Sequence, residues 1–210
     1  MKPQVYPVIH YLSDTIALEQ AAIAHNCGSH GVFLISHAGQ DDCLAPLALV
    51  IKKRFHCKVG INYLTDGALL AIDDAKTYGL DMVWSDTCGV SSNGFEPLAY
   101  RIEEEIKNSK IDFFGSVAFK YQSYEAQPAK AAYNAKSLGF IPTTSGQATG
   151  EAPDIEKIIS MAPVAIASGM TAQNIDIFKP YLSHILVSTG ISLDEHHFCP
   201  EKLKQFMSKI

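Results

Sequence analysis

Three short strings in the C-terminal third of the chain decide its fold: Thr144-Ser145-Gly146, Ala167-Ser168-Gly169 and Ser188-Thr189-Gly190. Each string closes an apolar run, and the three glycines lie 23 and 21 residues apart. This interval accommodates one strand, one helix and two loops, which is the repeating unit of a (β/α) barrel. In such barrels the loops after the last strands often bind phosphate through backbone N–H groups. The strings therefore predict a barrel with a phosphorylated ligand.

Apolar runs typical of β-strands recur along the whole chain, and segments with helical spacing lie between them. The runs cover residues 5–11, 31–35, 58–63, 81–85, 111–119, 140–143, 163–167 and 184–187. Glycine ends the helical pattern at Gly28, Gly79 and Gly139, each just before an apolar run. A glycine in this place is typical of a helix C-terminus. The chain is thus built from repeated strand–helix units.

Strands that are apolar on both faces and alternate with helices belong to a parallel sheet. Such a sheet is either a closed eight-stranded barrel or a doubly wound open sheet. The barrel is favoured because the glycine endings recur in phase and no G-x-G-x-x-G follows the first run. We predict a single (β/α)8 TIM barrel domain over residues 1–210, with phosphate-binding loops after its last strands.

The composition excludes several classes of partner. With 210 residues and 47% hydrophobic content, the chain can bury a full core without disulfides or a structural metal. The net charge of −5 and the lack of a Lys/Arg-rich block argue against nucleic acid, and no apolar run is long enough to span a membrane. Five scattered cysteines without a C-x-x-C pair favour the cytoplasm. Whether the chain forms a homo-oligomer is left open.

In a barrel of this kind, the chemistry lies at the C-terminal ends of the strands. Three residues at such ends are predicted to be catalytic: Asp86, Lys120 and His10. Asp86 and Lys120 could act as an acid–base pair, because burial beside an opposite charge tunes both groups for proton transfer. The structural alternative for them is a simple ion pair. For His10, which lies inside an apolar run, the alternative is a hydrogen-bonded core histidine.

Two further groups of strand-end residues are predicted to contact a ligand. The polar residues predicted to bind substrate are Ser36, His37 and Asn62. The residues predicted to bind phosphate are Ser145, Gly146, Thr149, Gly150, Ser168, Gly169, Thr189 and Gly190. The alternative for residues 145–150 is a plain turn before a helix capped by Asp154. Function is favoured over that alternative because two more glycine turns recur in phase.

These residues resemble the BtpA family, a group of ribulose-phosphate-binding-type TIM barrels named for a protein of photosystem I biogenesis. Residues 145–154 are similar to the family's S-G-x-A-T-G-x-x-P-D, and residues 167–175 to its G-S-G-V-T-P-E-N-V. Earlier in the chain, residues 10–12 resemble its H-L-L, residues 59–64 its V-G-V-N-V-L, and Lys120 the lysine that ends its fifth strand. The resemblance spans nearly the whole chain and implies the barrel fold.

The chain also departs from the family pattern. The proline-rich stretch after H-L-L is absent, and Ser36-His37 replace an acidic and amide pair at the second strand end. The resemblance to this family implies no defined reaction for the chain. It implies only an assembly or stability role in one branch.

Three functions of different classes follow from these patterns. The first is binding of a sugar or nucleoside phosphate, with isomerase or lyase chemistry by general acid and base that needs no cofactor. The second is a non-catalytic binding or assembly factor. The third is a metal-dependent hydrolase, which requires His10, His37 and a carboxylate to converge. No spacing in the sequence supports that convergence, so no metal is predicted, and His196-His197 are interpreted as part of a solvated loop.

Overall fold

The computed structural model describes residues 2–210 and contains a closed barrel of parallel strands. Around the barrel the strand order is β1-β10-β9-β8-β7-β4-β3-β2. The bounds of these strands are β1 (Gln4–His10), β2 (Gly31–Ile35), β3 (Lys58–Asn62), β4 (Met82–Ser85), β7 (Asp112–Ser116), β8 (Ile141–Thr144), β9 (Val164–Ala167) and β10 (Leu182–Val187). The eight strands predicted from the sequence are confirmed, and their ends differ from the prediction by only a few residues.

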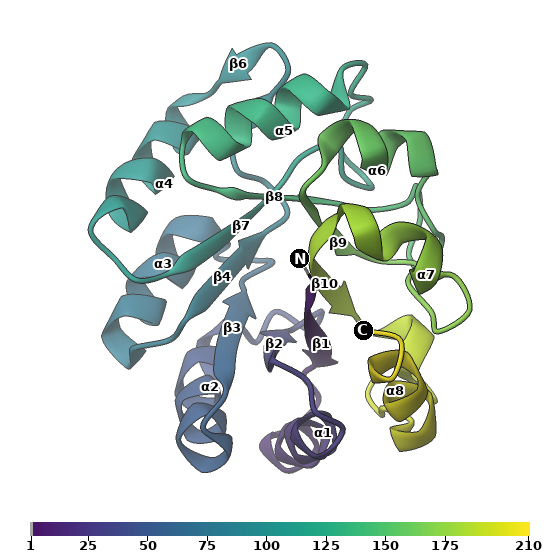
Figure 1. The fold of residues 1–210 in the computed structure, drawn as a ribbon. Helices are drawn as coiled ribbons and strands as arrows, with labels where there is room; N and C mark the ends of the chain where they lie inside the picture. Colours follow the sequence, from purple (N-terminus) through teal and green to yellow (C-terminus); the bar gives the residue numbers. More distant parts are fainter. Residues whose placement is uncertain (1) are drawn as a thin grey trace.

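The helices form a ring outside the strands (Figure 1). Their bounds are α1 (Asp14–Asn26), α2 (Asp41–Phe55), α3 (Gly67–Tyr78), α4 (Pro97–Lys107), α5 (Pro128–Ser137), α6 (Ile155–Met161), α7 (Ile175–Phe178) and α8 (Pro200–Met207). The predicted (β/α)8 TIM barrel is therefore confirmed. The helix ends at Gly28, Gly79 and Gly139 are also confirmed, since these glycines have φ angles of 81°, 64° and 77°. Within residues 2–210, no helix has the length and apolar character needed to cross a membrane.

A short hairpin interrupts the regular alternation between β4 and α4. Its strands are β5 (Val90–Ser91) and β6 (Gly94–Phe95), which pair antiparallel, and it packs against α5. No sequence pattern predicts this hairpin, because its strands are too short to show a period of two. It lies outside the barrel and does not change the order of the eight parallel strands (Figure 1).

Side chains of the strands alternate between two separate cores. One core lies between the strands and the helices, and the other fills the barrel interior. The interior is dominated by aromatic rings, and the rings of Phe33 and Phe114 meet edge to face with centroids 5.2 Å apart. Trp84 caps this stack and donates from its indole nitrogen to the Ser116 hydroxyl at 3.0 Å. The filled interior forces any ligand site to the end of the barrel.

His184 lies in the interior near the opposite end, where burial lowers its pKa from 6.5 to about 4. Its ring stacks on Tyr6 with centroids 6.1 Å apart. The folded chain therefore keeps this imidazole neutral at a pH where the unfolded chain binds a proton. Above pH 6.5 the group has no effect on stability, and as the pH falls from 6.5 towards 4 it removes up to about 3 kcal/mol of the free energy of unfolding.

We expect the His184→Phe substitution to reduce this acid sensitivity, because phenylalanine keeps the ring packing and binds no proton. Urea unfolding at pH 7 and at pH 4.5 measures the effect as the loss of unfolding free energy between the two values. His25→Gln, at an exposed position of α1, is the control and should lose as much stability as the unchanged protein. An equal loss in the His184→Phe variant would contradict the prediction.

Candidate functional site

A cavity of about 310 Å³ opens at the C-terminal ends of the barrel strands. Its apolar lining includes Val8, Ile35, Trp84, Ala167 and Leu186, which come from five different strands and their ends. Polar residues of the loops after the strands surround this floor. An apolar base with a few convergent polar groups is typical of a small-molecule site.

The structure gathers most of the predicted site residues at this cavity. The ones that line it are His10, His37, Asp86, Lys120, Thr149, Ser168, Gly169, Thr189 and Gly190. The predicted residues that do not line it are Ser36, Asn62, Ser145, Gly146 and Gly150. The end of β1 and the loops after β2, β3, β4, β7, β8, β9 and β10 thus contribute to one site although they are far apart in the sequence.

Asp86 follows β4 and is held by neighbouring amides. Asn62, which is fully buried, donates from its side-chain nitrogen to a carboxylate oxygen of Asp86 at 3.3 Å. The amide of Gln122 donates to the backbone oxygen of Asp86 at 2.7 Å. Burial raises the pKa of Asp86 above its ordinary value, although the bond from Asn62 and the charge of Lys120 act in the opposite direction. A carboxyl group with a raised pKa is suited to exchanging protons.

Lys120 lies in the loop after β7, and both its backbone and its side chain form hydrogen bonds to the loop after β8. Its backbone N–H donates to the Ser145 hydroxyl at 2.8 Å, and its side-chain ammonium donates to the Thr149 hydroxyl at 3.0 Å. Ala118 and Tyr121 flank it with φ angles of 48° and 65°, in the left-handed region that side chains rarely adopt. No carboxylate in the described part of the chain forms an ion pair with Lys120. Lys120 thus lines the cavity without forming an ion pair with Asp86.

Three glycines of the predicted phosphate loops are required by the packing of one loop on the next. A Cβ atom at Gly146 or at Gly169 would meet the carbonyl oxygen of Glu151 far inside van der Waals contact. A Cβ atom at Gly190 would meet the carbonyl oxygen of Met170 in the same way. These glycines therefore bring the loops after β8, β9 and β10 together, whether or not a ligand is bound. Their role in phosphate binding stays a prediction.

The predicted residues outside the cavity hold its loops in place. Ser36 is buried, and its hydroxyl accepts the N–H groups of Ala38 and Gln40 at 3.3 and 3.2 Å. Ser145 is also buried and donates to the carbonyl oxygen of Gly146 at 2.8 Å. The N–H of Gly150 donates to the Ser168 hydroxyl at 3.0 Å, which ties the loop after β8 to the loop after β9.

Lys157, which no sequence pattern singled out, also holds these loops in place. The ammonium of Lys157, on α6, donates to the carbonyl oxygens of Ala118 and Ser145 at 2.5 and 3.0 Å. Burial lowers the pKa of Lys157. Its single charge thus joins the loop after β7 to the loop after β8. A surface-like helix position carries no sequence signal for such a contact.

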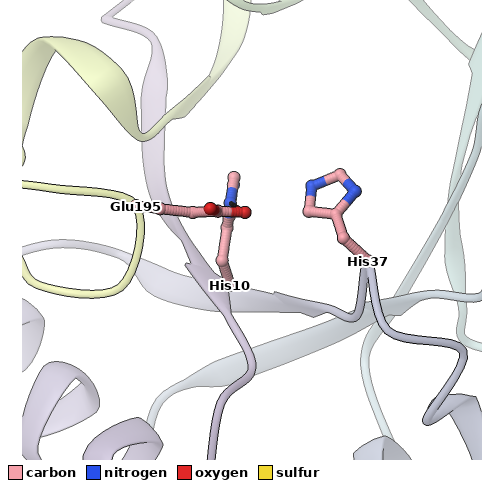
Figure 2. A group of neighbouring side chains, drawn as sticks. All are labelled: His10, His37 and Glu195. Carbon is pink, nitrogen blue, oxygen red and sulfur yellow. Dashed lines mark ion pairs between the residues drawn. The ribbon is translucent and has the colours of Figure 1, made fainter.

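The side chains of His10, His37 and Glu195 come together (Figure 2). The two histidines line the cavity, and all three residues line an adjoining hollow. His10 ends β1, His37 follows β2, and Glu195 lies in the loop after β10. One ligand-type atom from each residue lies within 4.8 Å of the others, and Nδ1 of His10 is 3.8 Å from a carboxylate oxygen of Glu195. Burial and the neighbouring His37 lower the pKa of His10 to about 4, so its imidazole is neutral at pH 7.

The convergence of two histidines with a carboxylate was not expected from the sequence, and Glu195 was missed. The only signal near it was the adjacent His196-His197 doublet. His196 contacts the β1 end, since its Nδ1 lies 3.0 Å from the carbonyl oxygen of His10. This contact links the loop after β10 to β1. It depends on the closure of the barrel, which makes the first and last strands neighbours.

Comparison with known proteins supports the fold. No protein-family model matches the chain, and no curated protein matches its sequence. Among solved structures, phosphoribosyl anthranilate isomerase from Thermus thermophilus is 14% identical, with 98% of this chain and 97% of that chain covered and a TM-score of 0.70. The YdjI aldolase from Escherichia coli K12 is 12% identical, with 90% and 76% covered and a TM-score of 0.64.

A further structure is phosphoribosyl anthranilate isomerase in complex with reduced 1-(o-carboxyphenylamino)-1-deoxyribulose 5-phosphate. It is 15% identical, with 99% of this chain and 97% of that chain covered and a TM-score of 0.65. At these identities the likeness establishes the fold alone. The chain therefore has the same (β/α)8 barrel fold as these enzymes.

Proposed function

We propose that this protein binds a phosphorylated small metabolite, a sugar or nucleoside phosphate, in the cavity at the C-terminal end of the barrel. The phosphate group would lie against the loops that carry Ser168, Gly169, Thr189 and Gly190. The reacting end would face Asp86 and Lys120, which exchange protons with the ligand in an isomerase or lyase reaction.

The observation that carries the proposal is that Asp86 and Lys120 line the same cavity without forming an ion pair. An acid whose pKa is raised by burial, opposite an ammonium group, is suited to moving a proton from one atom of a ligand to another. The hydroxyl groups of Thr149, Ser168 and Thr189 lie on the same rim and offer hydrogen bonds to an oxyanion.

One of the solved structures of the same fold supports this choice of ligand, since it has a phosphorylated compound bound. Of the three structures described above, two are phosphoribosyl anthranilate isomerases, one of them with a deoxyribulose 5-phosphate compound bound, and the third is an aldolase. We also propose that the chain is a distant relative of the BtpA family, on the residues quoted for that resemblance. This relationship implies no defined reaction, so the proposed reaction class is based on Asp86 and Lys120 alone.

Ligand binding is tested by thermal unfolding against a panel of sugar phosphates and nucleotides, with inorganic phosphate included. A ligand at a hundredfold excess over its Kd stabilises the folded chain by about 2.7 kcal/mol, which raises Tm by roughly 5 to 10 °C for a chain of this length. We expect the Thr189→Asp variant to lose most of this shift, because the new carboxylate repels phosphate. Thr189 is exposed, so the substitution should leave the fold intact.

Thr87→Asp is the matched control. Thr87 is exposed in the loop after β4 and does not line the cavity, so the same added charge should leave the shift unchanged. Equal losses in the two variants would indicate a nonspecific effect of charge. No shift with any compound would favour the non-catalytic assembly factor, which is the second function predicted from the sequence.

A further inference from the structure

We propose that His10, His37 and Glu195 bind a divalent transition metal ion of the zinc class at the mouth of the cavity (Figure 2). This site goes beyond the proposed phosphate binding, and it does not depend on it. It replaces the prediction from sequence that no metal binds.

The donor atoms are of the kind and number that such an ion takes. Two imidazoles and one carboxylate form a set found in catalytic zinc sites, which keep at least one further position for water or substrate. Ligand atoms around a tetrahedral zinc ion lie about 3.4 Å apart, as follows from bond lengths near 2.1 Å. The three donors here lie within 4.8 Å of one another. His37 and Glu195 are exposed, so small rotations of their side chains suffice to close the remaining distance.

His10 supplies a second, independent observation. Its Nδ1 atom is buried but has no hydrogen-bond partner within the described residues. Buried polar atoms in proteins are almost always paired, and an unpaired one calls for an unseen ion or water. The nearest charged oxygen, on Glu195, is 3.8 Å away, which is too far for a hydrogen bond. A metal ion between the imidazole and the carboxylate would satisfy both groups.

His10, His37 and Glu195 lie where an ion bound to them would be next to the cavity. His10 and His37 line the main cavity, and the same two side chains line an adjoining hollow together with Glu195. An ion held by the three residues would therefore have its free coordination positions near the bound ligand. When bound, it would act as a Lewis acid towards a carbonyl or hydroxyl oxygen. The residues themselves hold the ion and leave Asp86 and Lys120 free for proton transfer.

The alternative is that His10 and Glu195 form a structural pair with no metal, and that His37 is near them by chance. The test is titration of the metal-free protein with Co²⁺, followed by absorption in the visible range, and with Zn²⁺, followed by calorimetry. No phosphorylated compound is added, so the result is independent of ligand binding. We expect one ion per chain and visible bands of cobalt with nitrogen ligands.

The variants His37→Gln and Glu195→Gln each remove one donor from an exposed position and should fold normally. Loss of a supporting residue alone costs about 10- to 100-fold in metal affinity, so loss of a ligand should weaken binding by at least about 100-fold. His197→Gln is the control, because His197 is in the same loop as Glu195 but contacts Asp194 instead. It should bind the metal as the unchanged protein does.

Two outcomes would overturn the proposal. One is the absence of stoichiometric binding of either metal. The other is equal affinity in the unchanged protein and the His37→Gln and Glu195→Gln variants, which would mean adventitious binding to surface histidines only. A protein that binds phosphate compounds but no metal would retain the proposed function and lose this site.

Discussion

The Lys120→Met substitution is expected to lower kcat by about 10²- to 10⁴-fold, the range that general acid–base catalysis contributes. The substrate for the assay is the phosphorylated compound that raises Tm most in the panel. Methionine keeps a chain of similar length beside the rings of Phe119 and Tyr121 but removes the ammonium group. The backbone N–H of residue 120 still donates to Ser145, so the loop after β7 should keep its course.

The same variant should still show the rise in Tm with this compound, because the cavity floor and the loops after β9 and β10 are unchanged. Lys130→Met is the control, since Lys130 is exposed on α5 and does not line the cavity. It should have the kcat of the unchanged protein. If Lys120→Met also has an unchanged kcat, Lys120 takes no part in the reaction and the acid–base mechanism fails.

The Gly169→Ala substitution is expected to lower the free energy of unfolding by about 2 to 5 kcal/mol. Gly169 has a φ of 72°, and a left-handed conformation costs a residue with a side chain about 1 to 2 kcal/mol. A Cβ atom would also meet three backbone atoms of Glu151 and Ala152, and forced packing of this kind costs about 1 to 3 kcal/mol. Urea unfolding at pH 7 measures the sum.

Gly139→Ala separates the two contributions. Gly139 has a φ of 77°, but a Cβ atom there would meet nothing within 4 Å. It should therefore lose only the cost of the backbone conformation, about 1 to 2 kcal/mol. If Gly169→Ala and Gly139→Ala lower the free energy of unfolding by the same amount, the loops after β8 and β9 do not pack as closely as described. For the same reason, a larger residue at Gly169 would not be a clean test of phosphate binding, because it would displace the loops after β8 and β9.

Under the proposed function, Asp86 and Lys120 are the residues that favour an enzyme over a non-catalytic binding protein. A protein that only binds a ligand has no need for a partly buried carboxyl group with a raised pKa in the same cavity as an ammonium group that has no ion-pair partner. A carboxyl group with a raised pKa is expected where protons are exchanged. If a metal ion is also bound by His10, His37 and Glu195, the cavity holds both a Lewis acid and a proton-transfer pair.

The local pattern of the sequence was sufficient for the fold and for many of the residues at the site. Apolar runs, helical spacing and glycine at the helix ends are properties of neighbouring residues, so they can be read along the chain. The strand ends are then known, and because parallel strands end on one rim, the amino-acid sequence alone places Asp86, Lys120 and His37 there. Their presence at one cavity follows from the same rule.

What the sequence could not provide are contacts that depend on closure of the barrel and on the direction of single side chains. Asn62 lies at a strand end, yet its amide turns to Asp86 and not to the cavity. Gly146 and Gly169 lie in separate turns, and only the tertiary structure shows that both approach the same carbonyl oxygen of Glu151.

Glu195 is the clearest case, because 185 residues separate it from His10 in the sequence. The two meet because β10 pairs with β1 and directs the loop that follows it over the end of the first strand. The sequence by itself therefore determined the barrel and the rim on which its polar residues gather. The tertiary structure alone decided which of those residues touch, because contact depends on strand register and loop course, which no local pattern encodes.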